Sequence, residues 1–271
     1  MSARGAVAVA GLPDAADLER RFGGLRRLYG DSAYARLRAG RVAIVGVGGV
    51  GSWAAEALAR SGVAALTLID LDHVAESNIN RQVQALGSTL GAAKVGALAQ
   101  RIAEIHPACA VHQVEQFVEA GNWPALLHDA PVDVVIDACD QLSAKLVLAA
   151  WAMEVSGPSG PALVVCGAAG GKRKPQAVEV DDLAQVTHDP LLASLRQRLR
   201  KQTAERQLSG PQARFGVHCV YSREAVARPT GDEAMDSTLN CQGYGSGVAV
   251  TATFGMVAAQ QAIELLIARA P

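Results

Sequence analysis

Hydrophobic positions along the first 165 residues fall into short apolar runs separated by amphipathic stretches. The run at residues 42–47 is rich in β-branched side chains and apolar on both faces, which is typical of a strand buried in a parallel sheet. Similar runs predict further strands at residues 65–71, 110–114, 132–138 and 162–165. Helical patterns lie between them at residues 52–60, 92–105 and 143–155. This alternation predicts an α/β fold whose core is a Rossmann-like, doubly wound and mostly parallel sheet.

The two ends of the chain depart from this alternation. Residues 1–19 are expected to form a flexible leader, and a polar, Arg-rich helical stretch covers residues 18–39. After Gly171 the chain becomes charged and irregular. Its patterns predict a helix near 189–207, a strand at 217–221, a polar loop at 228–238 and a helix at 248–268. We expect one domain over 20–271, with a Rossmann-like core at about 40–170 and a C-terminal, substrate-side extension at about 171–271.

Composition narrows the class of protein. The 271 residues are 50% hydrophobic and 19% charged, with a formal net charge of −1. Such a chain is neither disordered nor a globally basic nucleic-acid binder, although it leaves room for a local basic patch. The stretch 243–263 has no formal charge, but its Gln, Thr, Ser and Gly residues favour a buried core helix over a membrane span. We expect a cytoplasmic protein without a membrane partner.

Cysteine and histidine spacing gives no metal signature. The five cysteines are Cys109, Cys139, Cys166, Cys219 and Cys241. None of them forms a C-x-x-C pair, so we predict reduced thiols and no zinc site. The six histidines show no ligand spacing either, although His188 and His218 flank the C-terminal region of the expected site.

A glycine-rich turn follows the first predicted strand and opens a helix. Its sequence GVGGVG, residues 46–51, fits the pattern G-x-G-x-x-G with Gly46, Gly48, Gly49 and Gly51. Glycines let the backbone approach a pyrophosphate, and the helix N-terminus contributes N–H groups and the positive end of its dipole. Asp70 lies 19 residues beyond Gly51, at a strand end where an acid binds ribose hydroxyls. The turn predicts a nucleotide site, and it does not distinguish NAD from ATP.

Three further polar groups stand near predicted strand ends, where open α/β sheets bind ligands. They are Asp72 with Ser77, Asn78, Asn80, Arg81 and Gln82; Lys94 at the start of a helix; and Asp140 just past a strand. A hydride-transfer site has no use for this set. A triphosphate site needs such residues, because a guanidinium binds phosphate oxygens, an ammonium neutralises them and a carboxylate holds Mg²⁺. Taken singly, each residue has an ordinary explanation as well. Arg81 can equally be a surface charge, and Asp140 can be the cap of the next helix.

These residues also carry a family resemblance. The segment LTLIDLDHVAESNINRQ, with GVGGVG before it and GAAKV and DACD after it, resembles the ThiF/MoeB/ubiquitin-activating superfamily. Those enzymes use ATP to adenylate a carboxylate. The implied roles are a phosphate turn at Gly49, a ribose contact at Asp70, phosphate contacts at Asn78 and Arg81, neutralisation by Lys94, and Mg²⁺ binding at Asp140, next to Gln141. Arg81, Lys94 and Asp140 are the expected catalytic residues.

The N-terminal segment departs from the superfamily pattern. Protein-activating relatives carry an RYxRQ segment whose Arg reaches the nucleotide of a neighbouring subunit. Here the segment is RFGGLRRLY, so Arg21 or Arg27 is the candidate, and the resemblance implies a homodimer. The zinc cysteines of those relatives are missing, which argues against a ThiF- or MoeB-type partner enzyme.

Four longer segments narrow the resemblance. RFGGLRRLYG, GSWAAEALARSG, DPLLASLRQRL and TATFG resemble the bacterial tRNA threonylcarbamoyladenosine dehydratases, from about Arg21 to the last helix. This implies ATP-dependent cyclisation of threonylcarbamoyladenosine next to the tRNA anticodon, with sulfur-relay proteins as occasional partners. Adenylation would give the threonyl carboxylate a leaving group, AMP, and a ureido nitrogen of the same nucleoside would close the ring. Proximity favours such an intramolecular step.

Basic residues in the C-terminal part indicate where tRNA binds. In the helix near residues 191–201 the leucines share one stripe and the basic side chains fall outside it. The expected tRNA-binding residues are Arg196, Arg198, Arg200 and Lys201 in this helix, and Lys172, Arg173 and Lys174 after a glycine pair. Such clusters bind phosphate backbones without reading sequence, and a solvated charged face is the competing interpretation.

Two other functions stay open from the sequence alone. One is activation of the C-terminal glycine of a ubiquitin-like sulfur-carrier protein, and the other is a non-catalytic nucleotide-binding sensor. A thioester at Cys219 or Cys241, as some relatives form, is the weaker interpretation beside a buried or neutral thiol. The Gly-rich segment 240–247 is either a loop over the site or the entry to the last helix.

Overall fold

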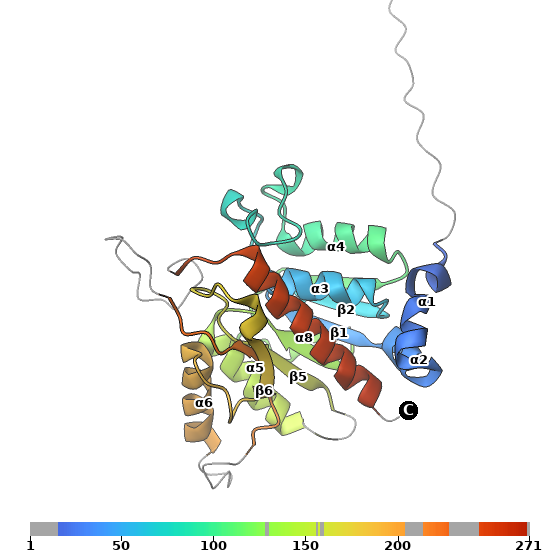
Figure 1. Cartoon of the computed structure of the whole chain (residues 1–271). Coiled ribbons are helices and arrows are strands. Elements are labelled where there is room, and N and C mark those ends of the chain that lie inside the picture. The colour runs from blue at the N-terminus through green and yellow to red at the C-terminus, as the bar shows by residue number, and fades with distance from the viewer. Residues whose placement is uncertain are drawn as a thin grey trace, which may run out of the picture.

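One mixed sheet organises the molecule (Figure 1). The computed structural model describes residues 16–127, 130–155, 157, 160–203, 214–227 and 244–269. Within them, seven strands have the order β3-β2-β1-β4-β5-β7-β6. They are β1 (Arg41–Val45), β2 (Ala65–Ile69), β3 (Ala110–Val114), β4 (Val134–Asp137), β5 (Ala162–Cys166), β6 (Val178–Asp182) and β7 (His218–Ser222). Neighbours pair in parallel except β6, which runs antiparallel to β7. The predicted doubly wound α/β sheet is confirmed.

Helices cover both faces of this sheet. They are α1 (Leu18–Tyr29), α2 (Asp31–Ala39), α3 (Gly51–Arg60), α4 (Lys94–Ile105), α5 (Leu142–Val155), α6 (Pro190–Thr203) and α8 (Val248–Ala268). Successive side chains of a strand point to opposite faces. Accordingly, Val42 and Ile44 of β1 pack with α3, α4 and α8, whereas Ala43 and Val45 pack with α5 and α6.

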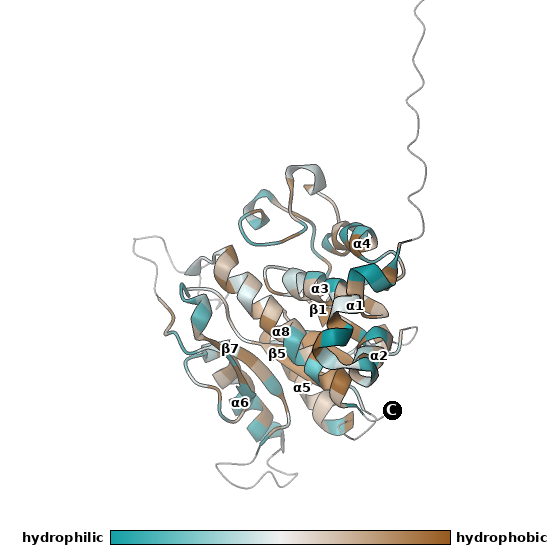
Figure 2. Cartoon of the chain, turned by 45° about the vertical axis from the view of Figure 1, so that its right-hand side comes forward, coloured by the Kyte–Doolittle hydropathy of each residue, from teal (hydrophilic) through white to brown (hydrophobic). Residues whose placement is uncertain are grey.

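The last helix belongs to this core. Among the described residues, α8 is the one helix long and apolar enough to cross a bilayer. Its side chains Phe254 and Ile263 lie in the core shared with α3 and the sheet, and Figure 2 shows its largely apolar colouring. The two helices approach closely at Gly255, where a Cβ would overlap the carbonyl oxygen of Val50. This is the packing expected of a buried core helix.

Strand register sets the place of the site. Val45 at the end of β1 is aligned with Ile69 of β2 and Asp137 of β4. Asp137 is in turn aligned with Val165 of β5. The carboxyl ends of four neighbouring strands therefore lie at one level, and the segments that follow them share one edge of the sheet.

Two elements differ from the sequence prediction. The helical stretch at 18–39 is two helices, because Gly30 has φ +80° and interrupts it. The charged segment at 178–182 is an edge strand, β6, which pairs with β7 in the described sheet. Its sequence VEVDD alternates over only four residues and none of them is buried, so it lacks the apolar run by which the other strands were predicted. α6 begins at Pro190, because the carboxylate of Asp189 accepts the Leu192 N–H as an N-cap. The predicted leader up to residue 15, residues 204–207 of the helix and the loop 228–238 lie outside the described residues.

Candidate functional site

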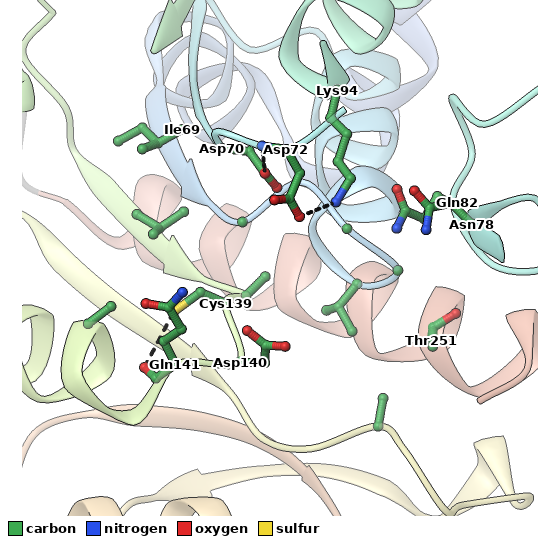
Figure 3. A pocket seen from close by; sticks show the side chains of 18 of the residues that line it. Ile69, Asp70, Asp72, Asn78, Gln82, Lys94, Cys139, Asp140, Gln141 and Thr251 are labelled. Carbon is green, nitrogen blue, oxygen red and sulfur yellow. Dashed lines mark hydrogen bonds and ion pairs between the residues drawn. The ribbon is translucent and has the colours of Figure 1, made fainter. Parts of the chain in front are cut away.

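A cavity of about 320 Å³ opens at the carboxyl ends of β1, β2, β4 and β5. Its walls are the glycine turn after β1, the polar segment after β2 and the segments after β4 and β5. Thr251 of α8 completes the lining (Figure 3). This is the edge at which doubly wound sheets bind ligands, and the volume lies at the lower end of the range for small-molecule sites.

The glycine turn is shaped by close backbone contacts. Gly46 has φ +83°, and a Cβ there would lie 2.9 Å from the Cα of Cys139 in the neighbouring turn. A Cβ on Gly51 would overlap the carbonyl oxygen of Gly46. Only glycine fits both positions, and the result is a tight turn that aims the N-terminus of α3 at the cavity.

An acidic and a basic group face the turn from β2 and α4. Asp70 accepts the Val47 N–H at Oδ2 (2.8 Å) and the Asp72 N–H at Oδ1 (2.9 Å). Burial raises the pKa of Asp70, and the charge of Lys94 opposes that rise in part. Lys94, whose side chain is 8% exposed, places its Nζ 2.7 Å from Oδ2 of Asp72 (Figure 3). The ammonium is thus held at the cavity wall by a more exposed carboxylate.

Hydrogen bonds orient the segment that carries Arg81. Its Nη1 donates to Ser77 O (2.6 Å) and to Oδ1 of Asn80 (2.9 Å), and its carbonyl accepts from Nε1 of Trp53. Oδ1 of Asn78 accepts the Ala75 N–H, which closes the preceding turn. Arg81, a half-buried residue as a whole, lines the cavity beside the glycine turn.

The opposite wall follows β4. Asp140 and Gln141 are exposed and line the cavity, and Figure 3 shows them across from Lys94 and Asp72. Behind them Lys145 and Asp137 form an ion pair that is fully buried. Burial lowers the pKa of Lys145, but the attraction of the Asp137 carboxylate outweighs this, so the pKa is raised and the lysine stays charged.

Most of the predicted site residues meet in this cavity. Those that line it are Gly46, Gly48, Gly49, Asp70, Asp72, Ser77, Asn78, Arg81, Gln82, Lys94, Asp140 and Gln141. Two predicted residues do not. Gly51 lies behind the turn, where it permits the close approach of α3, and Asn80 donates from Nδ2 to Ser246 O instead. Both shape the site from outside.

Sequence reasoning missed several lining residues. Gln116 and Phe117 follow β3, Ala168 follows β5, and Thr251 comes from the first turn of α8. None of them belongs to a recognisable motif; only their position after strand ends could have singled out the first three. Phe117 is 40% exposed, which is unusual for an aromatic side chain and consistent with a surface that a ligand covers.

Two of the seven predicted tRNA-binding residues donate hydrogen bonds to carbonyl groups of the protein itself. Lys172 is 4% exposed, and its Nζ donates to Ser222 O (3.2 Å) and Glu224 O (2.7 Å), so it joins loops and does not face solvent. Burial lowers its pKa. Arg196 is half-buried and donates to the carbonyl groups of Leu183 and Val186. The expected exposure is wrong for Lys172, whereas Arg196 is half-buried and its Nη1 is taken up by these carbonyl groups. The exposed members are Arg173, Lys174, Arg198, Arg200 and Lys201.

Other candidates can be placed as well. Arg21 and Arg27 are both exposed, but Nη1 of Arg21 donates to the carbonyl oxygens of Glu104 and Ile105 at the end of α4. Cys219 is fully buried in β7 and burial raises its pKa well above the usual value, so it is the neutral core thiol that the sequence favoured. Cys241 and residues 240–243 of the Gly-rich segment lie outside the described residues.

Neither flanking histidine joins the site. His188 is exposed, with φ 57°, and its Nδ1 lies 2.9 Å from Oγ1 of Thr187. His218 is half-buried at the start of β7, and burial lowers its pKa. In the part of the chain that the structure describes, no group of three or more His, Cys, Asp or Glu residues is arranged to hold a metal.

Taken together, the cavity suits a nucleotide with a chain of phosphates. Arg81 and Lys94 bring positive charge to the cavity beside the N-terminus of α3, a combination that can bind anionic groups, and the carboxylate of Asp70 can accept from a hydroxyl. Asp140 adds an exposed carboxylate on the opposite wall, a group that could serve as a ligand for a divalent cation. This charge pattern has no use in hydride transfer.

Comparison with known proteins agrees with this geometry. A model described as the ThiF family matches residues 22–271. The tRNA threonylcarbamoyladenosine dehydratase of Escherichia coli (strain K12) is 41% identical over 261 residues, covering 93% of this chain and 95% of the relative. The protein of the same name from Haemophilus influenzae is 37% identical, covering 92% and 94%. The crystal structure of the E. coli protein in complex with ATP has a TM-score of 0.81 and 40% identity, covering 93% of this chain and 96% of that chain. The chain therefore belongs to the ThiF family and, within it, to the family of tRNA threonylcarbamoyladenosine dehydratases.

Proposed function

We propose that the protein is an ATP-dependent, tRNA-modifying dehydratase that cyclises threonylcarbamoyladenosine next to the anticodon. Near-full-length similarity to relatives of that name supports the proposal, as does the relative whose crystal structure holds ATP. The observation that carries it is the cavity itself, in which Arg81 and Lys94 face the glycine turn and Asp140 faces them. That arrangement suits a triphosphate.

Each residue has a defined task in this proposal. The glycine turn, residues 46–51, and the N-terminus of α3 bind the phosphates, and Asp70 binds the ribose. Arg81 and Lys94 screen the charge of the α-phosphate, so that a carboxylate can approach it. Asn78, Gln82 and Ser77 contribute polar contacts to the same phosphates, and Asp72 keeps Lys94 in place through the 2.7 Å ion pair.

The donor set fits Mg²⁺ rather than a protein-caged metal. Mg²⁺ keeps several waters and is usually held by one or two carboxylates together with substrate phosphates. Asp140 offers one exposed carboxylate on the cavity wall, and Gln141 stands beside it. When bound, the ion neutralises phosphate charge. Asp140 would hold and orient the ion, and no zinc site is proposed.

The substrate supplies the rest of the chemistry. The threonyl carboxylate attacks the α-phosphate, pyrophosphate leaves, and a mixed anhydride with AMP forms. A ureido nitrogen of the same nucleoside then attacks the activated carbonyl carbon, loses its proton and expels AMP. One carboxylate oxygen departs on AMP, so the nucleoside loses one water overall. The ring closes within one molecule, so the protein needs no nucleophile and acts by proximity and charge.

The tRNA would lie along α6. Leu191 of its first turn lines the cavity, and Arg198, Arg200 and Lys201 are exposed two to three turns further on. At about 1.5 Å per residue, ten residues of helix span about 15 Å, which suits contacts to the phosphates of nucleotides flanking the modified one. Arg173 and Lys174 are exposed as well, after β5.

We also propose a cytoplasmic homodimer in which Arg27 reaches the nucleotide of the second subunit. Both arginines are exposed, and the support for Arg27 is that the guanidinium of Arg21 is already hydrogen-bonded to the end of α4. Sulfur-relay proteins remain proposed partners.

Nucleoside analysis tests the proposal. The protein is incubated with ATP, Mg²⁺ and tRNA that carries threonylcarbamoyladenosine, and the tRNA is digested for mass spectrometry. The proposal predicts a nucleoside lighter by one water, formed only with ATP. An unchanged nucleoside, with pyrophosphate exchange stimulated by a ubiquitin-like carrier protein, would mean that the chain activates a protein C-terminus instead. ATP binding without turnover on either substrate would identify a nucleotide sensor.

A further inference from the structure

A buried ion pair lies directly behind the wall that carries Asp140. Lys145 in the first turn of α5 and Asp137 at the end of β4 are both fully buried. Nζ of Lys145 lies 3.0 Å from Oδ1 of Asp137 and donates to Cys166 O, at the end of β5, over 2.8 Å. One ammonium therefore joins the ends of two neighbouring strands at the edge where the cavity opens.

Only one of the two carboxylate oxygens of Asp137 accepts hydrogen bonds from the described residues. Its Oδ1 accepts from Nζ of Lys145, from the N–H of Cys139 (3.2 Å) and from the Cys139 thiol (3.0 Å). Its Oδ2 is buried and accepts no hydrogen bond from the described residues. A pair of well-packed apolar side chains is often as stable as a buried ion pair, or more so. Stability alone thus gives no reason for this arrangement.

The position of the ion pair behind the cavity gives a reason for it. Residues 138–141 follow Asp137 immediately, and all four line the cavity. Gly46 of the glycine turn packs against the backbone of Cys139, so a shift of one turn would move the other. Residues 167–169, which follow Cys166, line the cavity too. The ammonium of Lys145 therefore holds two cavity walls from behind.

We infer that Lys145 and Asp137 are positioning residues, which hold the turn 138–141 so that Asp140 meets the metal-bound phosphates at the correct distance. The inference rests on the proposed function. Misplacement of a reacting group by about 1 Å lowers rates by about 100-fold, and groups behind the ligands commonly set their geometry. The pair touches no substrate; it acts through Asp140.

The test compares Lys145→Met, Asp137→Asn and the double variant. Either single change leaves a buried group without its partner and is expected to destabilise the fold. The double variant removes both charges, so its thermal unfolding should return toward that of the wild type. Even so, we expect the kcat of the double variant to be about 10- to 100-fold lower than that of the wild type. Its half-saturating Mg²⁺ concentration should be at least several-fold higher, while its KM for tRNA should stay within twofold of the wild-type value.

A matched control is available on the other face of the sheet. Glu56 of α3 is buried, with a side chain 4% exposed, and binds the partly exposed Arg101 of α4 at 2.6 Å, away from the cavity lining. The double variant Glu56→Gln/Arg101→Met should be less stable, while its Mg²⁺ dependence stays that of the wild type. A shift in Mg²⁺ dependence confined to the Lys145 and Asp137 variants supports the inference.

Two outcomes overturn it. One is a folded Lys145→Met/Asp137→Asn protein with wild-type kcat and Mg²⁺ half-saturation. The other is an equal rise of the Mg²⁺ requirement in the control. If the wild-type protein itself makes no cyclised nucleoside, the proposed function fails, and calorimetric titration of ATP at varied Mg²⁺ still tests the positioning role by the same comparison.

Discussion

Replacing Lys94 with methionine tests whether its charge serves catalysis or the stability of the fold. Methionine keeps the unbranched, apolar stem in the space that the side chain occupies and removes only the charge. The ammonium lies 2.7 Å from Oδ2 of Asp72, whose side chain is 56% exposed. Because an ion pair with so exposed a partner contributes about 0–1 kcal/mol, the free energy of unfolding should fall by no more than about 1 kcal/mol. For a chain of this size that corresponds to about 2–4 °C in Tm.

The effect on activity should be far larger. Among the described residues, Arg81 and Lys94 are the lysine and arginine side chains that line the cavity, so the variant would lose one of these two charges. The carboxylates of Asp70 and Asp72 would then face bound phosphates without that neutralisation. A charge-assisted hydrogen bond contributes about 1.5–3 kcal/mol net, and removal of a preorganised donor from developing charge costs about 2.7–4 kcal/mol in activation free energy. We therefore expect kcat/KM to fall by about 10²- to 10³-fold.

The assay follows ATP-dependent loss of water from the nucleoside in wild type, Lys94→Met and a control, Arg60→Met. The Arg60 side chain is 58% exposed and pairs with Glu56, which keeps Arg101 as a second partner. The control should match the wild type. A Lys94→Met protein with activity within threefold of the wild type would refute the reasoning. The reasoning would also be refuted if Lys94→Met lowered Tm by 10 °C or more, because the loss of activity would then follow from the loss of stability.

Three further predictions concern other parts of the chain. Gly51→Ala should lower both Tm and ATP affinity, measured by thermal unfolding and calorimetry, because its Cβ would overlap a backbone carbonyl oxygen; wild-type values would contradict the turn geometry. Arg198→Glu with Lys201→Glu should weaken tRNA binding in a salt-dependent manner without changing ATP binding, and unchanged tRNA affinity at physiological salt would remove α6 from the interface. Burial raises the pKa of Glu56, but hydrogen bonds from Arg101 and Arg60 outweigh this, so the pKa is lowered. Its stabilisation is therefore present above about pH 4.5 and is lost as pH falls through the lowered pKa. Glu56→Gln should be less stable than wild type at pH 7 by about 1–2 kcal/mol, with the difference vanishing in acid; a difference independent of pH would contradict the assignment.

Local patterns account for what could be predicted from the sequence. The glycine turn and Asp70 are recognisable because a phosphate contact dictates residue types at fixed spacing after one strand. Lys94 and Asp140 could be added because parallel strands end at the same edge, so residues far apart in the chain meet there. Buried parallel strands such as β1 and β4 were equally clear, because both of their faces are apolar.

Tertiary contacts account for what was missed. Lys172 and Arg196 were grouped with exposed cations because sequence spacing does not reveal which carbonyl groups a long side chain will reach. The pairing of Lys145 with Asp137 brings a helix onto a strand end, and neither residue differs in pattern from an ordinary surface charge. Thr251 enters the cavity only because α8 returns across α3 from the far end of the chain.

The central claim is that the cavity makes a carboxylate attack the α-phosphate of ATP, and an isotope measures this directly. tRNA is prepared with ¹⁸O in both oxygens of the threonyl carboxylate and is converted with ATP and Mg²⁺. The account predicts AMP that carries one ¹⁸O in its phosphate, together with unlabelled pyrophosphate and a cyclised nucleoside that keeps the other label. Unlabelled AMP, or ADP and phosphate as the products, would contradict it.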